Sequence, residues 1–289
     1  MRTQDILALL TLAALWGGSF LFMRMAAPEF GPVSLIGVRV SIAAAFLLPL
    51  LLASGKASAL LQNAGPLLLV GVFNSALPFC LFAFATLSLT AGLTAVINAA
   101  VPMFTAVVGV LWLREKLAGV ALLGLLVGLG GVALLVWDKM TFTTDGLGWG
   151  VLAGLLGSLS YALAANYTKV SLTGLGSLEL ATGSQVSASL VLAIPCIWLW
   201  PQEPVSLRAW LAVITMGIAS TGVAYILFFR LIASLGPSRA VTVTYLVPVF
   251  GMMFGAIFLA EAITTDMVLG CALILFGTAL ATGMIHPLR

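Results

Sequence analysis

Long apolar runs dominate this chain, and only short links separate one run from the next. Each run has about 20 residues, which is the length of an α-helix that crosses the hydrocarbon core of a bilayer. Of the 289 residues, 62% are hydrophobic and 7% are charged, whereas a soluble domain carries roughly 25% charged residues. Too few charged side chains are available for a water-facing surface, so the sequence predicts an all-α polytopic membrane protein.

About ten spans follow from the positions of the glycines, prolines and charged clusters that divide the runs. The first run, from about Ile6 to Met23, ends at Arg24 without a small-residue cleavage site, so we interpret it as a retained helix. No link is long enough to hold a soluble domain. We therefore expect the activity of the protein to lie within the bilayer.

An internal repeat is visible in two short stretches, Val-Pro-Met-Phe at 101–104 and Val-Pro-Val-Phe at 247–250. The same offset of 146 residues relates further pairs: Phe82 and Phe228, Glu115 and Glu261, Arg39 and Gln185. The repeat predicts two five-helix units, residues 1–140 and residues 141–289. Because five is odd, the two units cross the membrane in opposite directions, an arrangement found in alternating-access transporters.

Positive charges near the span ends predict the orientation of the chain. Those expected on the side of the termini are Arg2, Lys56, Arg114, Lys116, Lys169, Arg230, Arg239 and Arg289, and those on the other side are Arg24, Lys139 and Arg208. We therefore expect a multi-pass protein of the cell inner (cytoplasmic) membrane with both termini in the cytoplasm. This loop asymmetry explains the net charge of +3, and we expect no nucleic-acid partner.

The prolines of the repeat, Pro102 and Pro248, would free the backbone carbonyls of Asn98 and Thr244 from their helical hydrogen bonds. Asn98 and Thr244 are themselves polar, and Thr94 lies one turn before Asn98 on the same helix face. A bilayer tolerates freed backbone groups only where protein or water satisfies them. We interpret both prolines as hinges in helices that line a substrate pathway. The alternative is a pair of packing kinks whose polar side chains bond neighbouring helices.

Further candidates for substrate contacts are aromatic residues accompanied by scattered amides and hydroxyls, a combination that suits an amphipathic organic solute. Trp16 lies too deep in its run for an interfacial anchor, and Tyr161 occupies nearly the equivalent position of the second unit. The set comprises Trp16, Ser19, Asn74, Phe79, Phe82, Tyr161, Tyr225, Phe228 and Tyr245. The alternative is that the bulky members of this set pack between helices or face lipid.

Arg39 is the one charged side chain well inside a run. A charge within the bilayer is costly and indicates a functional site. Arg39 would orient a substrate carboxylate, with Gln185 as its neutral counterpart in the second unit. Alternatively, Arg39 would extend along its helix toward the outer membrane surface, about 9 Å away at 1.5 Å per residue.

These motifs resemble the drug/metabolite transporter superfamily, in its EamA family of ten-helix exporters built from paired five-helix repeats. The residues that carry the resemblance are Ala-Leu-Trp-Gly-Gly-Ser-Phe at 14–20 with Arg24, Pro102 with Glu115, and Pro248 with Glu261. The resemblance covers nearly the whole chain and implies a transporter. It also implies export, so together with the aromatic and polar candidates it predicts an exporter of small amphipathic metabolites such as amino acids, although the family exports other compounds too.

Energy coupling can be approached from the titratable groups. No Asp or Glu falls at a predicted midplane, and the single histidine, His286, lies near a helix end. Proton-coupled carriers place a carboxylate or histidine relay inside the membrane. The sequence therefore favours a uniporter over a proton-coupled multidrug efflux transporter, which stays possible through Glu115 or Glu261.

Enzymatic and metal-binding functions find no support in the sequence. No nucleophile–base set or metal-ligand cluster is recognisable, and the three cysteines form no Cys-x-x-Cys motif. We expect no enzyme activity, no cofactor and no metal. The expected partners are a small-molecule substrate and the lipid bilayer, and the sequence leaves open whether the protein is a monomer or a homodimer.

Overall fold

The computed structural model describes residues 2–115, 119–140, 142 and 146–282, with the backbone alone at residues 237 and 238. Within these residues all regular elements are helical, and nine helical spans are long and apolar enough to cross a membrane. A shorter apolar helix, Thr265–Ala281, supplies the tenth. The predicted all-α polytopic membrane fold is confirmed.

The first five spans belong to the first unit. They are α1 (Thr3–Phe30); α2 (Pro32–Ala53), followed by the short α3 (Ser58–Gln62); α4 (Ala64–Gly71), η1 (Val72–Ala76) and α5 (Leu77–Ser88) as one span; α6 (Ala91–Asn98) with α7 (Val101–Leu113); and α8 (Gly119–Val136) with the 3-10 turn η2 (Trp137–Lys139). The third and fourth spans are thus interrupted, while the other three are continuous helices.

The second five spans repeat this pattern. They are α9 (Leu147–Ser171); α10 (Ser177–Trp198); α11 (Leu207–Gly217), η3 (Ile218–Val223) and α12 (Ala224–Leu235) as one span; α13 (Pro237–Ala240), η4 (Val241–Tyr245) and α14 (Val247–Leu259) as one span; and α15 (Thr265–Ala281). The interrupted spans are again the third and fourth of the unit.

The irregular features of the two units recur at the offset found in the sequence. The π-helical segments η1 and η3 begin at Val72 and Ile218, 146 residues apart. The helices α7 and α14 both end in a left-handed residue, Arg114 at φ 55° and Ala260 at φ 51°. A positive φ is uncommon outside glycine, so its recurrence shows that the two units share backbone detail as well as helix order.

The expectation that the two prolines kink continuous helices is wrong. The helix α6 has already ended at Asn98, and Pro102 is the second residue of α7. Pro248 is likewise the second residue of α14, after the 3-10 segment η4. In the first turn of a helix, proline removes no intrahelical hydrogen bond. Each proline therefore starts a new segment of a broken span.

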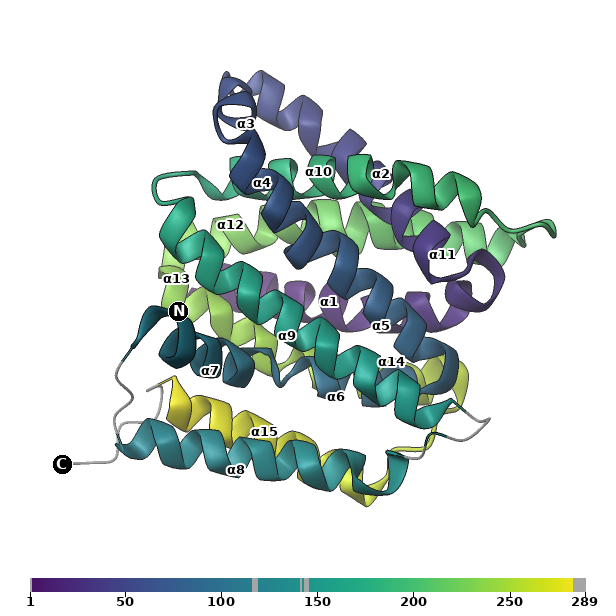
Figure 1. The fold of residues 1–289 in the computed structure, drawn as a ribbon, viewed down its shortest axis with the longest axis vertical. Coiled ribbons are helices and arrows are strands. Elements are labelled where there is room, and N and C mark those ends of the chain that lie inside the picture. The colour runs from purple at the N-terminus through teal and green to yellow at the C-terminus, as the bar shows by residue number, and fades with distance from the viewer. Residues whose placement is uncertain (1, 116–118, 141, 143–145, 283–289) are drawn as a thin grey trace.

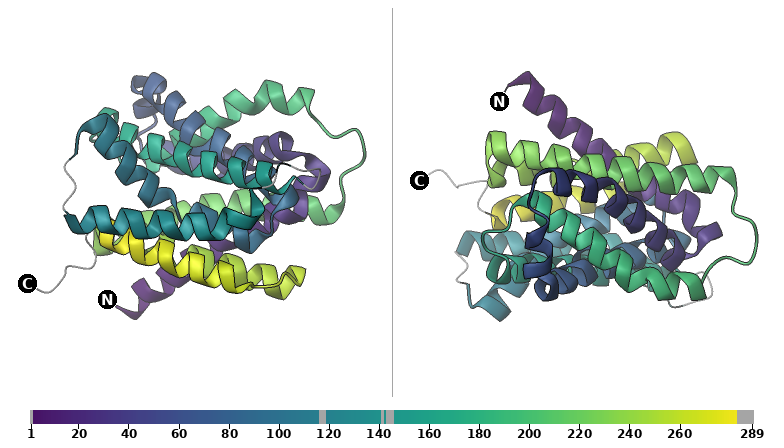
Figure 2. Two further views of the ribbon diagram at one scale, coloured as in Figure 1. Left: turned by 60° about the horizontal axis from the view of Figure 1, so that its bottom comes forward. Right: turned by 90° about the horizontal axis from the view of Figure 1, so that it is seen from above.

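The arrangement of the spans follows the repeat. At one edge α8 and α15 lie side by side, as Figures 1 and 2 show from two directions. Their backbones come close because Gly124 faces Gly277, and a Cβ on Gly124 would lie 2.6 Å from the carbonyl oxygen of Gly277. At the other edge α2 packs against α10. Each edge thus pairs one span with its equivalent in the other unit, and the remaining spans lie between the edges.

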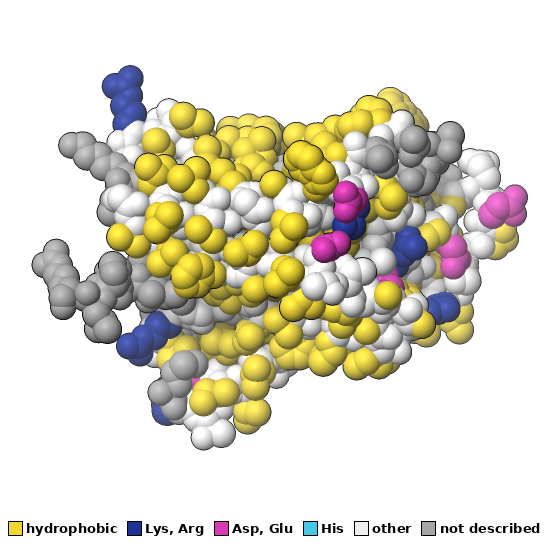
Figure 3. Space-filling model, turned by 90° about the horizontal axis from the view of Figure 1, so that it is seen from below, with side chains coloured by type: hydrophobic (Ala, Val, Ile, Leu, Met, Phe, Trp, Pro, Cys, Tyr) yellow, Lys and Arg dark blue, Asp and Glu magenta, His cyan; other side chains and the backbone are white. Residues whose placement is uncertain are grey.

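The outer surface suits a lipid environment. Figure 3 shows one face of the molecule, where hydrophobic side chains spread across the surface and the charged ones lie at its left end and in its right half. Large apolar side chains such as Leu126, Ile257 and Phe258 are mostly exposed. Exposure on this scale would be unfavourable in water and is favourable in hydrocarbon.

The two ends of the helix bundle are named from the chain ends. The terminal side is the one where α1 begins and α15 ends, and the opposite side is the one where α1 ends at Phe30 and α15 begins at Thr265. Since each unit has five spans, α1 begins on the terminal side, whereas its equivalent α9 begins on the opposite side.

Candidate functional site

A cavity of about 770 Å³ lies between the two units. Its walls come from α1, α2, η1, α5, α7, α9, α10, η3, α12 and η4, with contributions from the ends of α4, α6, α14 and α15. The residues predicted from the sequence that line it are Trp16, Ser19, Arg39, Asn74, Phe79, Phe82, Asn98, Pro102, Tyr161, Tyr225, Phe228, Thr244 and Tyr245. The structure brings these residues together, and their role in binding a substrate stays a prediction.

Three predicted residues are not among those that line the cavity. Thr94 is buried in α6, where its hydroxyl donates to the carbonyl of Thr90 at 2.8 Å. Gln185 is buried as well, and its Nε2 donates to Oγ of Ser75 at 2.9 Å. Pro248 is covered by the packing of α14. Helical periodicity placed Thr94 on the face of Asn98, but only Asn98, the last residue of α6, lines the cavity, and Thr94 one turn earlier is buried.

The aromatic wall contains two equivalent ring pairs, and each pair combines one ring from each unit. The ring of Trp16 contacts that of Phe228 with centroids 5.3 Å apart, and the ring of Tyr161 stacks on that of Phe82 at 6.0 Å. Phe82 and Phe228 are repeat partners, so the two contacts are related by the symmetry of the fold. All four rings line the cavity rather than facing lipid.

Arg39 lies deep in this cavity with only 3% of its surface exposed. Its Nε donates to Oγ1 of Thr221 at 3.1 Å, and its Cζ lies 3.9 Å from the ring centroid of Phe79. The interpretation in which Arg39 reaches the membrane surface is therefore wrong. The hydroxyl of Thr221 itself donates to the carbonyl of Met216 at 3.1 Å, which leaves the hydroxyl oxygen free to accept from Arg39.

The π-helical segments explain why Arg39 and Gln185 meet polar partners. Arg39 bonds to Thr221 in η3, and Gln185 bonds to Ser75 in η1, which is the equivalent position of the other unit. A π-bulge widens one turn and occurs frequently at functional sites. The two contacts match in position, but only the longer arginine side chain extends into the cavity.

Further polar residues line the cavity beside the predicted set, among them Asn166, Ser184, Ser220 and Thr221 from α9, α10 and η3. Of these four, only Ser184 was not recognisable in the sequence. The repeat contained a signal for two of them, because Ser220 and Thr221 are the partners of Asn74 and Ser75. No comparable signal marks Ser184, whose hydroxyl lies 2.7 Å from that of Ser75.

The opposite side of the bundle is closed by hydrogen bonds between neighbouring spans, one set of which joins the two units. The carboxylate of Glu261 accepts from the backbone N–H groups of Ala91 at 2.9 Å and Gly92 at 3.3 Å, at the start of α6. Arg24 donates to the carbonyls of Thr86 and Leu87 at the end of α5. These contacts join the ends of α14 and α1 to the first unit's third and fourth spans beyond the deepest cavity residues.

The cavity opens to the terminal side. Its lining extends from Arg39 at depth to Glu115, Lys169 and Thr282, which are exposed at the helix ends. Glu115 and Lys169 form an ion pair beside the opening. The segments α7 and η4, which correspond to the touching helices α14 and α6 of the closed side, both line the cavity.

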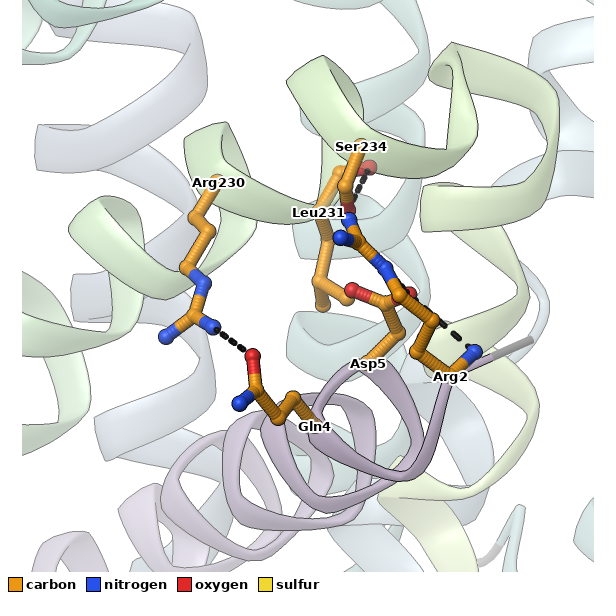
Figure 4. A network of polar contacts seen from close by, with 6 residues as sticks. All are labelled: Arg2, Gln4, Asp5, Arg230, Leu231 and Ser234. Carbon is orange, nitrogen blue, oxygen red and sulfur yellow. Dashed lines mark hydrogen bonds and ion pairs between the residues drawn. The ribbon is translucent and has the colours of Figure 1, made fainter.

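A separate polar network on the terminal side joins α1 to α12 (Figure 4). Arg230 donates to Oε1 of Gln4 at 3.4 Å, and Nε of Arg2 lies 3.5 Å from Oδ2 of the buried Asp5. Asp5 also interacts with Ser234. These contacts link two neighbouring helices on the terminal side.

The ten apolar spans of the described residues form two related units around a cavity that is closed at one end and open at the other, and this arrangement defines a multi-pass membrane protein with transporter architecture. The profile of the EamA-like transporter family matches residues 4–137 and 148–283. The chain belongs to this family and is a membrane transporter.

Relatives and solved structures agree with this assignment. The chain is 23% identical over 280 residues to "Uncharacterized transporter YoaV" of Bacillus subtilis (strain 168), covering 96% of each protein. It is 26% identical over 292 residues to "Uncharacterized inner membrane transporter YedA" of Escherichia coli (strain K12), covering 98% of this chain and 93% of that one. A crystal structure at 21% identity superposes with a TM-score of 0.67 over 100% of both chains, which shows a shared fold.

Proposed function

We propose that the protein exports small amphipathic metabolites across the inner membrane by alternating access, with amino acids as the first class to test. The observation that carries this proposal is the cavity of about 770 Å³ between the two units. Sites for small organic molecules have volumes of roughly 300–1,000 Å³ and combine apolar walls with a few polar groups. Paired aromatic rings and single amides, hydroxyls and one guanidinium fit that description.

Alternating access is supported by two observations: the two units are related, and the two ends of the cavity between them differ. The two units repeat their helices, breaks and close contacts, yet the cavity is closed on the opposite side and open on the terminal side. An inverted repeat allows the two units to exchange these arrangements around a fixed central site. Pro102 and Pro248, at the starts of α7 and α14, would act as hinges in this exchange.

Orientation in the membrane is inferred from the positive charges. The described structure places Arg2, Lys56, Arg114, Lys169, Arg230 and Arg239 on the terminal side, and Arg24, Lys139 and Arg208 on the other. Lys116, His286 and Arg289 lie outside the described residues. With both termini in the cytoplasm, the cavity opens to the cytoplasm, where an exporter takes up its substrate. A reporter fused to the C-terminus tests this orientation, and a periplasmic signal would contradict it.

Uniport is the coupling mode that the cavity favours. Among its described lining residues the carboxylates are limited to Glu115, which lies at the opening and is paired with Lys169. A proton relay needs a titratable group within the membrane. A proton-coupled multidrug efflux transporter is the second candidate, and Glu115 is the group on which it would depend.

Counterflow in proteoliposomes tests the proposed function. Purified protein is reconstituted with an unlabelled amino acid inside, and uptake of the labelled amino acid is followed across a panel at two pH values. We expect counterflow for at least one apolar amino acid, with little dependence on a proton gradient, and none in empty liposomes. Failure of every amino acid would exclude this substrate class, and strict dependence on a proton gradient would favour the efflux transporter.

A further inference from the structure

We infer that Arg39 is an anion subsite, and that the protein recognises its substrate by a carboxylate bound to this guanidinium. The inference rests on the proposed function and deepens it, because it names the group that a transported solute must carry. It also predicts that the amino group of an amino acid is dispensable.

The charge of Arg39 has no counterion in the described part of the chain. The ion pairs there are Arg2 with Asp5, Lys56 with Glu179 and Lys169 with Glu115. Arg39 is almost fully buried, and its Nη1 lacks a hydrogen-bond partner in the part of the chain that the structure describes. A buried charge is costly unless it is paired and hydrogen-bonded. An anionic ligand in the cavity would supply the missing partner.

The surroundings of Arg39 fix its orientation and leave Nη1 without a hydrogen-bond partner among the described residues. Thr221 holds Nε, and the ring of Phe79 covers one face of the guanidinium at 3.9 Å. A cation over an aromatic face is attracted by the ring, and the attraction is stronger when the cation is desolvated. A guanidinium held in this way presents a planar fork, and a carboxylate matches that fork with two parallel hydrogen bonds.

The rest of the cavity decides which solutes fit this subsite. Phe82 and Tyr161 lie beside Phe79, so an apolar body attached to the carboxylate would contact aromatic rings. Near Arg39 the described lining residues offer hydroxyls and amides but no carboxylate that would pair with a cation. An ammonium group close to Arg39 would be repelled, and the repulsion is strong at low dielectric. The structure therefore favours monocarboxylates and zwitterions over amines.

The equivalent position of the second unit supports a single anion subsite. Gln185 is neutral, its Nε2 is bound to Ser75, and it is not among the residues that line the cavity. The symmetry of the fold thus provides two equivalent contacts with a π-helical segment, and only the contact made by Arg39 carries a charge. A substrate would bind in one orientation, with its carboxylate toward the closed end of the cavity.

Four phenyl compounds of similar size separate the two charges of an amino acid: L-phenylalanine, 3-phenylpropionate, 2-phenylethylamine and 3-phenylpropanamide. Uptake of each labelled compound into proteoliposomes is measured for the wild type, Arg39→Gln, Arg39→Lys and, as a matched loss of one positive charge outside the cavity, Arg208→Gln. Elution as a single species and the thermal unfolding temperature establish that each variant is folded.

We expect the wild type and Arg208→Gln to transport the two carboxylates at least about tenfold faster than the amine and the amide, as the strength of charged hydrogen bonds suggests. Arg39→Gln should lose this preference, and Arg39→Lys should retain part of it. Equal transport of carboxylates by Arg39→Gln and the wild type would overturn the inference, as would a wild-type preference for the amine or the amide.

The wild-type panel decides the question even if Arg39→Gln does not fold, because a preference for the amine or the amide is visible without any variant. Transport without a carboxylate requirement would leave the proposed transport of amphipathic solutes standing and remove only the subsite. Transport of none of the four compounds would overturn the proposed function, and the inference with it.

Discussion

The two ends of the cavity use the same sequence device in two different ways. Each unit ends its fourth span in a left-handed residue followed by a glutamate, and each glutamate N–H bonds back to a glycine carbonyl, Gly109 for Glu115 and Gly255 for Glu261. The carboxylate of Glu261, however, accepts from the start of α6, whereas that of Glu115 is paired with Lys169. The same motif, a left-handed residue followed by a glutamate, therefore bridges two spans at the closed end and lies beside the opening at the other end.

The difference extends to the helices behind the glutamates. Gly251 in α14 touches α6, and a Cβ on it would lie 2.4 Å from Cβ of Ala95. The repeat partners of these residues are Thr105 and Val241, and both line the cavity. A tight helix contact on the opposite side thus corresponds to a water-accessible gap on the terminal side. The comparison shows that the sequence symmetry is preserved while the conformational symmetry is broken.

The largest expected effect comes from filling the tight contact. Gly251→Leu places a large side chain where Ala95 leaves no room, and overpacking of this kind costs about 3 kcal/mol in the free energy of unfolding. Thr105→Leu at the equivalent position faces the cavity and should cost less than about 1 kcal/mol. Thermal unfolding of both variants in detergent measures the difference, and equal destabilisation would show that the two ends are not distinct.

A smaller effect is expected at the closing carboxylate. Glu261→Gln keeps the size of the side chain but removes the charge that accepts two N–H groups at a helix N-terminus, a loss of about 2 kcal/mol. The opposite side should then open more often. In a background without the native cysteines, a cysteine at Ser19 should react several-fold faster with a membrane-impermeant thiol reagent added from that side. An unchanged labelling rate would show that Glu261 does not hold the opposite side closed.

Glu115→Gln should change stability less. Its ion pair with Lys169 is exposed on both partners, and exposed pairs contribute about 0–1 kcal/mol. We expect an unfolding temperature close to that of the wild type, together with slower counterflow if Glu115 serves closure of the terminal side. A loss of stability as large as that of Glu261→Gln would contradict the contrast between the ends.

The smallest predicted effect concerns the residue that Glu115 would meet on closure. The repeat partners of Ala91 and Gly92 are Pro237 and Ser238, and a proline has no N–H to donate. Closure of the terminal side would therefore lack one hydrogen bond that the opposite side has. Pro237→Ala restores the donor and should modestly raise the labelling rate of a cysteine at Ser19 from the opposite side. A lower rate would contradict this role.

The helices, the repeat and most cavity residues could be predicted because helix length, apolarity and a fixed offset can be read directly from the sequence. Sequence reasoning failed where tertiary context decides. The breaks before Pro102 and Pro248 depend on how α6 and η4 pack, and the depth of Arg39 depends on Thr221 and Phe79, which belong to other spans. The asymmetry of the two ends was invisible because a repeated sequence is compatible with both arrangements.

The most direct test of the account is the distance between Thr105 and Val241 across the opening. Spin labels at these positions in reconstituted protein report that distance by electron–electron double resonance, and labels at Ala95 and Gly251 are avoided because that contact is too tight. We predict a long distance without substrate and a second, shorter population that grows when a transported carboxylate is added. A single distance that no transported substrate alters would contradict alternating access between the two ends.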